Sequence, residues 1–388
     1  MDLKAIQSAL DERGFDAWLF YDHHHRDPIA YKVLGLSEKL MVTRRWFYLI
    51  PRTGEPQKLV HRIEAGHLDP VPGAKHEYSS WQELWEQLKA MLAGHKKLAM
   101  QYSPNNLVPY IGLVDAGTIE LVRSFGKEIM SSGDLVARFD AAWDEEQIQS
   151  HYAAGKAIDA IVPEFFQELG RRARNGGTDE YAMQQWVAEA FRRENLVTDD
   201  LPIVGCNANS GNPHYEPRAD RSASIQSGDF VLLDIFAKKN TPRAVYYDIT
   251  WTGIIGTPSE KQAKIFTIVR DARDAGVKKV QEAFTAKRRI AGWEVDDATR
   301  GHIASAGYVQ YFTHRTGHSI GENIHGNGAN IDNLETKDER EIIPNSCFSI
   351  EPGIYLPGEF GVRSEVNVLI RNGAAEVTGK IQREMVRI

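Results

Sequence analysis

Four acidic residues recur at matched spacings in the second half of this 388-residue chain. Asp234 and Asp248 are fourteen residues apart, and Glu351 and Glu365 are separated by the same interval. Each pair falls in two apolar segments that predict paired strands, which bring side chains on one face close together. Any one of these acids alone would more simply be an exposed strand residue. Because a buried carboxylate costs several kcal/mol unless a cation compensates it, the matched set favours a buried cation site.

Three histidines lie within the segment THRTGHSIGENIHG, residues 313–326. They are His314, His318 and His325, and one imidazole joined to four carboxylates would suit manganese, cobalt, iron or zinc better than copper. Two divalent ions held about 3.5–4 Å apart by shared carboxylates activate water and polarise a carbonyl group. The residues alone leave open which histidines take part, since such a histidine is often only a hydrogen-bonded polar group in a loop.

The composition argues against two classes of partner. A net charge of −7 and a pI near 6.0 disfavour nucleic acid, because phosphate binding needs clustered lysine and arginine. No apolar stretch approaches the roughly 20 residues that cross a bilayer, so no membrane association is expected, and the N-terminal residues lack the apolar core of a secretory signal. Cys206 and Cys347 have no partner at metal-ligand spacing, so we expect two reduced thiols and a cytoplasmic location.

A chain of this length is expected to form two domains, with a boundary near residues 140–144. Residues 1–140 alternate between strand-like apolar runs and amphipathic segments, which predicts a small α/β domain. A helix is expected after the capping box of Ser80 and Glu83. Strands are expected at 16–22, 96–102 and 118–124, together with a hairpin at 44–61 that turns at Thr53-Gly54.

Residues 141–388 predict an α+β domain in which helices pack on a mostly antiparallel sheet. Asp144 can cap a long helix, and a second helix is expected after Thr178. A third helix should begin at TPSE, residues 257–260, which combines a capping box with a proline at the first helical position. The strands of this domain are expected at 229–237, 244–253, 346–355 and 360–370.

One histidine and the four acids, in the order Asp234, Asp248, His318, Glu351 and Glu365, resemble the five-ligand pattern of the pita-bread metallopeptidases. This family includes methionine aminopeptidase, aminopeptidase P and prolidase. GHSIG, residues 317–321, resembles the Gly-His-x-x-Gly box of the family, and IEPGIY and GVRSEVNVLI are similar to its two glutamate strands. Residues 1–140 resemble the extra domain of creatinase, aminopeptidase P and prolidase. The resemblance implies a pita-bread catalytic domain at 141–388, with helices on a curved antiparallel sheet, and a creatinase-like α/β domain at 1–140.

The resemblance also implies a role for each site residue. Asp234 would bind one metal ion, His318 and Glu351 the other, and Asp248 and Glu365 would bind both. Glu351 would also carry the proton of the attacking water. Three histidines, His214 within GCNANSGNPHYEP, His314 and His325, would contact the substrate and stabilise the tetrahedral intermediate. Tyr355 and Arg363 would contact the substrate or lie near it.

The function implied by the resemblance is that of a metal-dependent exopeptidase of the Xaa-Pro dipeptidase or aminopeptidase P type. It would act through a hydroxide that bridges two divalent ions, most often manganese, on a short peptide with proline at the second position, and the chain would form a homodimer. A metal-dependent hydrolase or lyase of a small non-peptide substrate is the alternative. Creatinase-like amidinohydrolases and non-catalytic binding modules on this fold lose metal ligands, whereas all five are present here.

Two further stretches invite a functional interpretation. DHHHRDP, residues 22–28, looks like a metal site, but three adjacent histidines cannot all point to one centre. We expect a solvated loop there, with the alternative that it reaches the active site of a partner subunit. The basic segment KKVQEAFTAKRR, residues 278–289, is expected to be the solvated face of a helix rather than a nucleic-acid patch.

Overall fold

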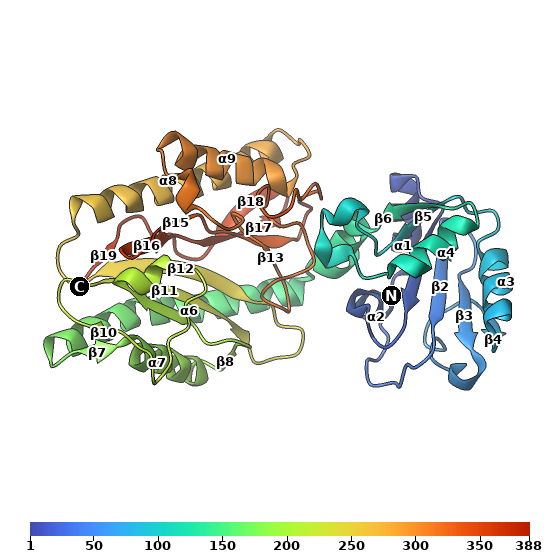
Figure 1. Ribbon diagram of the computed structural model, residues 1–388, viewed down its shortest axis with the longest axis horizontal. Coiled ribbons are helices and arrows are strands. Elements are labelled where there is room, and N and C mark those ends of the chain that lie inside the picture. The colour runs from blue at the N-terminus through green and yellow to red at the C-terminus, as the bar shows by residue number, and fades with distance from the viewer. The chain divides into compact units, whose positions relative to one another are not determined.

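The computed structural model describes all residues, 1–388, and the chain divides into two compact units (Figure 1). The first unit is Met1–Asp140 and the second is Ala141–Ile388. Each unit has hydrophobic cores of its own. No helix of the chain combines the length and the apolar character that crossing a bilayer requires.

The N-terminal unit is a mixed six-stranded sheet with helices on both faces. Trp18 and Phe20 of the central strand pack with α1 and α2, whereas Leu19 and Tyr21 pack with α3 and α4. The strands in spatial order are β4 (Ala74–Tyr78), β3 (Gln57–His61), β2 (Trp46–Pro51), β1 (Ala17–Asp22), β5 (Lys97–Met100) and β6 (Glu128–Ser131). The helices are α1 (Leu3–Arg13), α2 (Pro28–Leu34), α3 (Trp81–Met91), α4 (Ala116–Ser124) and α5 (Gly133–Val136).

The elements that the sequence pattern predicts in this unit form as expected, with one exception. The hairpin at 44–61 forms as the antiparallel pair β2–β3, and the capping box of Ser80 and Glu83 makes both of its hydrogen bonds. The prediction of a strand at 118–124 is wrong, because these residues belong to α4. The buried residues Ile119 and Val122 have helical spacing, which outweighs their β-branched side chains.

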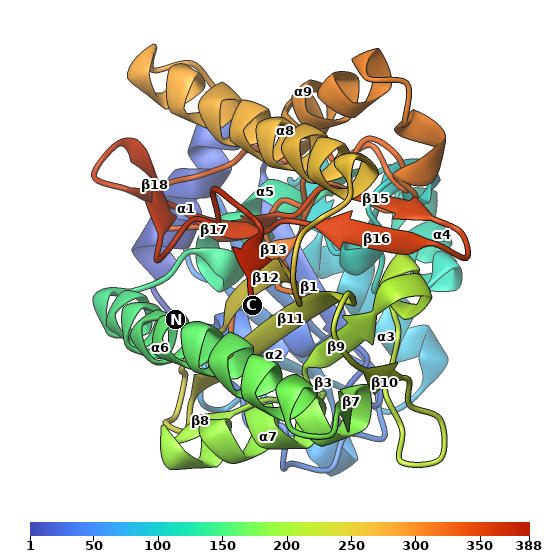
Figure 2. The ribbon, with the colours of Figure 1, turned by 90° about the vertical axis from the view of Figure 1, so that its left-hand side faces the viewer.

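The C-terminal unit places its strands between two pairs of helices, as Figure 2 shows. Helices α6 (Glu145–Arg174) and α7 (Glu180–Arg193) share one core with β11 and β12. Helices α8 (Glu260–Thr285) and α9 (Gly292–Ser305) pack on the strands of the C-terminal half. The strands are β7 (Thr178–Asp179), β8 (Leu196–Val197), β9 (Ile203–Cys206), β10 (Ser224–Ile225), β11 (Phe230–Lys239), β12 (Tyr247–Ile254), β13 (Ser319–Ile320), β14 (Cys347–Ile350), β15 (Gly353–Leu356), β16 (Phe360–Arg363), β17 (Val366–Arg371), β18 (Ala374–Thr378) and β19 (Val386–Arg387).

The strands of this unit form two larger sheets, which are mostly antiparallel. One has the order β19-β12-β11-β8, with β9 also paired to β11, and the other has the order β13-β14-β17-β18. Two small sheets, β15-β16 and β10-β7, complete the unit. The side chain of Asn367 in β17 hydrogen-bonds the backbone of Asp248 in β12, so the two larger sheets are joined next to the predicted metal ligands.

Two details of this unit differ from the prediction. Helix α8 is capped by Ser259, which forms its capping box with Gln262, so Pro258 precedes the helix instead of opening it. The expected strands 346–355 and 360–370 are each interrupted at a predicted ligand, one after Ile350 and the other after Arg363. A strand that stops at an acidic residue leaves the carboxylate free of the regular pleat, which is useful where several acids must converge.

Candidate metal centre

The β11–β12 hairpin presents the first two predicted ligands on one face. Asp234 lies opposite Thr250, and Phe236 lies opposite Asp248, so the two aspartates are diagonal neighbours in the antiparallel pair. Diagonal residues on one face remain within reach of each other. Both aspartates are buried, with side chains enclosed between the two larger sheets.

The two glutamates come from a second hairpin that changes direction at the site. Ile350 pairs with Val366 in the larger sheet, whereas Gly353 pairs with Arg363 in the small sheet beyond the interruption. Glu351 and Glu365 therefore face each other at the junction between the two paired regions. The backbone N–H of Glu365 donates to the carbonyl of Thr250 at 3.3 Å, which ties this junction to β12.

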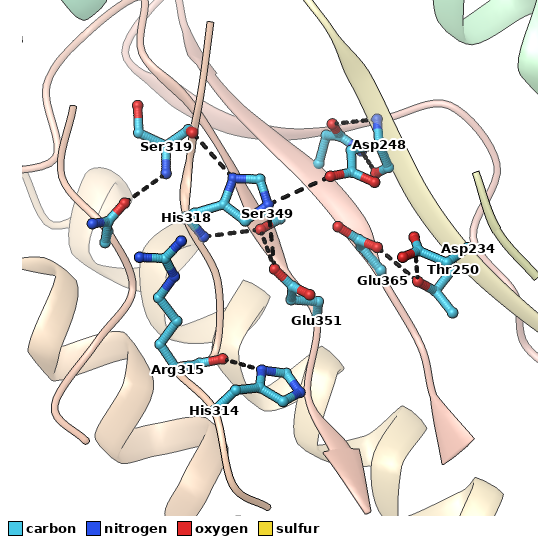
Figure 3. A network of polar contacts seen from close by, with 12 residues as sticks. Asp234, Asp248, Thr250, His314, Arg315, His318, Ser319, Ser349, Glu351 and Glu365 are labelled. Carbon is cyan, nitrogen blue, oxygen red and sulfur yellow. Dashed lines mark hydrogen bonds and ion pairs between the residues drawn. The ribbon is translucent and has the colours of Figure 1, made fainter. Parts of the chain in front are cut away.

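The five predicted ligands lie near one another, four of them buried and Glu351 half-buried (Figure 3). One ligand atom each from Asp248, His318 and Glu365 lies within 4.8 Å of the others. Glu351 reaches this group through His318, since its Oε1 lies 3.4 Å from the ring Nε2. Asp234 reaches it through Thr250, whose hydroxyl lies 3.1 Å from Asp234 Oδ1 and 2.8 Å from Glu365 Oε2.

The ring of His318 is oriented so that its Nε2 lone pair faces carboxylates. Its Nδ1 lies 3.1 Å from the carbonyl oxygen of Ser319, which can only accept a hydrogen bond, so Nδ1 carries the proton of the neutral ring. Nε2 lies 3.4 Å from oxygens of both Asp248 and Glu351. Burial lowers the pKa of His318, which favours the neutral ring. The lone pair of Nε2 therefore faces two carboxyl groups, an arrangement that a cation would stabilise.

One arginine offsets part of the negative charge. The guanidinium of Arg363 pairs with Asp234 through Nη2, and its Nε donates to the Thr250 hydroxyl at 2.9 Å. The same Nε lies 4.0 Å from Glu351 Oε2. A single fixed positive charge therefore serves four buried or half-buried carboxylates, which leaves an excess of negative charge in the pocket.

Three of the acids resist ionisation in the absence of a further cation. Burial raises the pKa of Asp234 to about 7, although Arg363 acts in the opposite direction. Burial and the neighbouring carboxylates raise the pKa values of Asp248 and Glu365 well above the ordinary range. Glu351 differs, because the effects of His318 and Arg363 outweigh its burial and hold its pKa below the usual value. Glu351 is therefore the acid that most readily stays ionised, which a group must be before it can accept a proton.

Two carboxylate oxygens in the pocket lack any hydrogen-bond donor. They are Oδ1 of Asp248 and Oε1 of Glu365, the same two acids that the resemblance makes shared ligands. Buried polar atoms without partners are rare and require an explanation. Oxygen-rich ligation with one imidazole fits divalent cations such as manganese, cobalt, iron or zinc, so the residues present fit a metal site.

The predicted substrate residues lie at different depths. His314 uses both ring nitrogens within the chain, one 2.7 Å from the carbonyl of Arg315 and the other 2.7 Å from the hydroxyl of Tyr355. The ring of His325 is exposed and stands edge-on to His318, with ring centroids 4.4 Å apart. His214 is also exposed, and only its backbone makes a hydrogen bond, to Asn212. His325 and His214 are therefore the imidazoles most available to an incoming molecule.

Three residues that support the ligands were not predicted. Thr250 contacts two acids, Ser349 donates to Glu351 at 3.0 Å, and Asn367 accepts from the backbone of Asp248 at 3.2 Å. Each lies two positions from a predicted ligand in the same strand system. Because residues two apart share a face, a polar residue at that distance from a buried acid was a usable signal.

Comparison with known proteins identifies the family. Residues 149–372 match metallopeptidase family M24. The Xaa-Pro dipeptidase of Pyrococcus horikoshii is 30% identical over 394 aligned residues, which cover 99% of this chain and 98% of that protein. The probable dipeptidase PepE of Mycobacterium tuberculosis is 30% identical over 256 residues, and the chain spans 62% of its length. The chain belongs to metallopeptidase family M24.

Solved structures of similar proteins confirm the predicted fold. The dipeptidase PepE from Mycobacterium ulcerans superposes with a TM-score of 0.70 at 23% identity, covering 100% of this chain and 96% of that one. A dipeptidase from Pyrococcus horikoshii gives a TM-score of 0.65 at 24% identity and covers 100% of both chains. The resemblance to the pita-bread family and the α+β fold class are therefore confirmed.

Proposed function

We propose that this protein is a two-metal exopeptidase that hydrolyses Xaa-Pro dipeptides or removes the first residue from longer Xaa-Pro peptides. The observation that carries the proposal is the cluster of potential ligands, in which Asp248, His318 and Glu365 converge and two buried carboxylate oxygens lack donors. Glu351 contacts this group at His318, and Asp234 is linked to it through Thr250. Relatives named Xaa-Pro dipeptidase, among them those of Pyrococcus horikoshii and Lactobacillus helveticus, support the reaction class. Membership of family M24 supports a metal-dependent peptidase.

The proposed ligands divide between two ions. Asp234 would hold one ion, His318 and Glu351 the other, and Asp248 and Glu365 would contact both. When bound, two divalent cations supply Lewis acidity for the scissile carbonyl and lower the pKa of the attacking water. Manganese is the first ion to test, with cobalt, zinc and iron as alternatives, since the ligand types suit all four.

The chain's own residues would move the proton and bind the peptide. Glu351, which stays ionised, would take the proton of the attacking water and return it to the leaving amine. His325 and His214, with exposed rings, would contact the peptide and stabilise charge that develops on the carbonyl oxygen. The Tyr355–His314 pair and Arg363 would line the site behind them.

The proposal includes three finer assignments. The substrate has proline at its second position, the protein is a homodimer, and it works in the cytoplasm. The cytoplasmic assignment is supported by Cys206 and Cys347, both buried and free, which need no oxidising compartment. Size-exclusion chromatography with light scattering tests the dimer directly.

A hydrolysis screen tests the proposed reaction. Purified protein is incubated with Xaa-Pro dipeptides, Xaa-Pro-Xaa peptides and peptides without proline, with added manganese or with a chelator, and the products are identified by mass spectrometry. The same preparation of an Asp248→Ala variant controls for contaminating peptidases. Metal-dependent cleavage of dipeptides alone indicates a dipeptidase, and release of the first residue from longer peptides indicates an aminopeptidase. Bound metal without any cleavage would overturn the proposal in favour of a hydrolase or lyase of a non-peptide molecule.

A further inference from the structure

Glu180, at the start of α7, is a buried acid outside the metal centre whose carboxylate organises a neighbouring loop. Its side chain is completely buried and forms no ion pair. Oε1 accepts from the backbone N–H of Cys206 at 2.6 Å, and Oε2 accepts from the hydroxyl of Tyr215 at 2.6 Å and from the backbone N–H of Ala223 at 2.8 Å. The amide of Asn209 lies 3.0 Å from both oxygens. Unlike the metal ligands, this acid has all its donors within the chain.

These four donors belong to a single segment, residues 206–223, which carries His214. They hold its beginning, its middle and its end, and Tyr215 is the residue next to His214. The segment is also attached to the metal-centre strands, since the backbone N–H of Gly361 donates to Ser210 Oγ at 2.9 Å. The carbonyl of Pro213 accepts from Arg363 at 3.5 Å, one residue before His214. The backbone around His214 is thus fixed from two sides.

We infer that Glu180 is a positioning residue that sets the location of the His214 ring through Tyr215 and the 206–223 segment. The ring itself makes no hydrogen bond within the chain, so its position depends on the backbone that carries it. An imidazole that must meet a developing charge loses most of its effect when displaced by about 1 Å. The inference rests on the proposed function, because it assigns His214 to peptide turnover.

The experiment compares three single variants with the wild-type enzyme. Tyr215→Phe removes one hydroxyl and leaves the ring, and Glu180→Gln replaces an acceptor oxygen by an amide that repels the surrounding donors. Tyr152→Phe is the matched control, since its hydroxyl also donates to a glutamate, Glu376, at 3.0 Å, but on the surface. We expect Tyr215→Phe and Glu180→Gln to lower kcat/KM by roughly tenfold to a hundredfold with metal content unchanged, and Tyr152→Phe to have no effect.

A double-mutant cycle separates positioning from general loss of stability. In a His214→Ala background, Tyr215→Phe should cause no further loss of kcat/KM, because the group that it positions is already absent. A role in stability alone would lower activity by the same factor in both backgrounds. Full activity of Tyr215→Phe, or losses that multiply with His214→Ala, would overturn the inference. Tyr215→Phe keeps the test valid if Glu180→Gln does not fold.

A spectroscopic readout keeps the inference testable even if peptide hydrolysis is absent. The ring signal of His214 in a proton–carbon correlation spectrum is assigned by its disappearance in His214→Ala. Glu180→Gln should shift or broaden this signal, although Glu180 is distant in sequence, whereas Tyr152→Phe should leave it unchanged. An unaltered signal in a folded Glu180→Gln protein contradicts the inference whatever the substrate. Absence of peptide turnover in the wild type would instead contradict the proposed function.

Discussion

Two regions of this chain contain acids and histidines, yet only one has the properties of a metal site. In the N-terminal unit, the loop DHHHRDP begins with Asp22, which is fully buried. Its Oδ1 accepts from the backbone N–H groups of Arg26 and Asp27, at 2.7 and 3.0 Å. Its Oδ2 accepts from the backbone of His25 at 3.1 Å and from the Tyr31 hydroxyl at 2.8 Å. The chain itself therefore satisfies this carboxylate.

The metal-centre acids show the opposite property. Asp248 and Glu365 each keep one oxygen without a donor, and His318 directs a lone pair at two carboxylates. Asp22 is as buried as Asp248 and Glu365, and histidine is denser in the loop, although the loop histidines are more exposed than His318. The difference teaches that ligand types alone do not define a metal site. A missing donor is not sufficient either, because Oδ2 of Asp27 in the loop also lacks one, and burial raises the pKa of this carboxyl to about 7, so that it can stay protonated. The metal centre differs because two such acids converge there with the lone pair of His318.

The largest expected effect comes from removing an acid in each region. Asp248→Ala should remove bound metal and reduce turnover by about 10³-fold or more, as expected for a residue on which the chemistry depends. Asp22→Ala should retain the metal and lower the free energy of unfolding by at least about 1–3 kcal/mol, because it leaves buried donors unpaired. Elemental analysis, kinetics and denaturant unfolding of both variants measure the contrast.

The opposite result for either variant would break the comparison. Metal retained at full stoichiometry in Asp248→Ala would show that the unsatisfied oxygens do not mark the ligands. Metal lost from a folded Asp22→Ala protein would show that the loop belongs to a metal site after all. Unfolding of each purified variant followed by circular dichroism distinguishes loss of metal from loss of the fold.

The next largest effect is expected on the pH dependence of stability, and it comes from a buried histidine whose two ring nitrogens both have hydrogen-bond partners in the chain. His151 is fully buried, with one ring nitrogen 2.7 Å from the carbonyl of Tyr246 and the other 2.8 Å from the hydroxyl of Thr378. Burial lowers its pKa from 6.5 to about 4. A ring that resists protonation when folded stabilises the protein above pH 6.5, and this stabilisation is lost as the pH falls towards 4. His318 has no such pair of chain partners.

We therefore expect the free energy of unfolding to fall by roughly 3 kcal/mol between pH 6.5 and pH 4 on account of His151. A His151→Gln variant should lose this part of the pH dependence and be less stable at neutral pH. Denaturant unfolding of both proteins at a series of pH values measures the difference. Parallel pH profiles for the two proteins would show that His151 is not the group responsible.

A smaller effect is expected from a residue that supports the ligands. Thr250→Val keeps the shape of the side chain but removes the hydroxyl shared by Asp234, Glu365 and Arg363. Loss of such a contact to metal ligands weakens metal binding by about 10- to 100-fold. Thr252 supplies the control, since it is equally buried in the same strand and its hydroxyl has no partner.

Competition titration with a metal chelator measures the affinity of both threonine variants. Thr252→Val should bind metal as tightly as the wild type, because no hydrogen bond is lost. Equal weakening by the two substitutions would mean that packing in β12, rather than the Thr250 hydroxyl, controls the site.

The sequence predicts the architecture well where local patterns agree with tertiary structure. The caps at Ser80 and Asp144 and the apolar runs of β11 and β12 locate their elements directly. The failures have physical causes. Residues 118–124 look strand-like through their β-branched side chains, although the spacing of Ile119 and Val122 is helical. At Ser259 two overlapping capping patterns compete, and the one with Gln262 forms.

The sequence indicates which acids belong to the candidate site, but it indicates the residues that support them less well. The spacing of the four carboxylates brings Asp248 and Glu365 together with His318, as the resemblance implies. The interruption at Glu351 is marked in the sequence by the Pro352-Gly353 pair that follows it, since proline cannot donate to a sheet ladder. The interruption before Glu365 has no such proline or glycine beside it. The contact of Asn367 with Asp248 depends on how two sheets meet, which no local pattern encodes.

The smallest effect on activity is expected from substitutions in the histidine loop, residues 22–28. Unchanged activity there would support the conclusion that the loop is not a metal site. His24 is exposed and adopts a positive φ of 62°, a conformation that asparagine accepts readily. Combined His23→Gln and His24→Asn substitutions should leave metal content and kcat/KM unchanged, with stability altered by no more than about 0.5 kcal/mol. Elemental analysis and kinetics at low and high protein concentration test this. If activity falls while bound metal stays constant, the loop contributes to a substrate site. The hydrogen bonds that Asp22 accepts from the loop would then serve to hold a functional loop rigid.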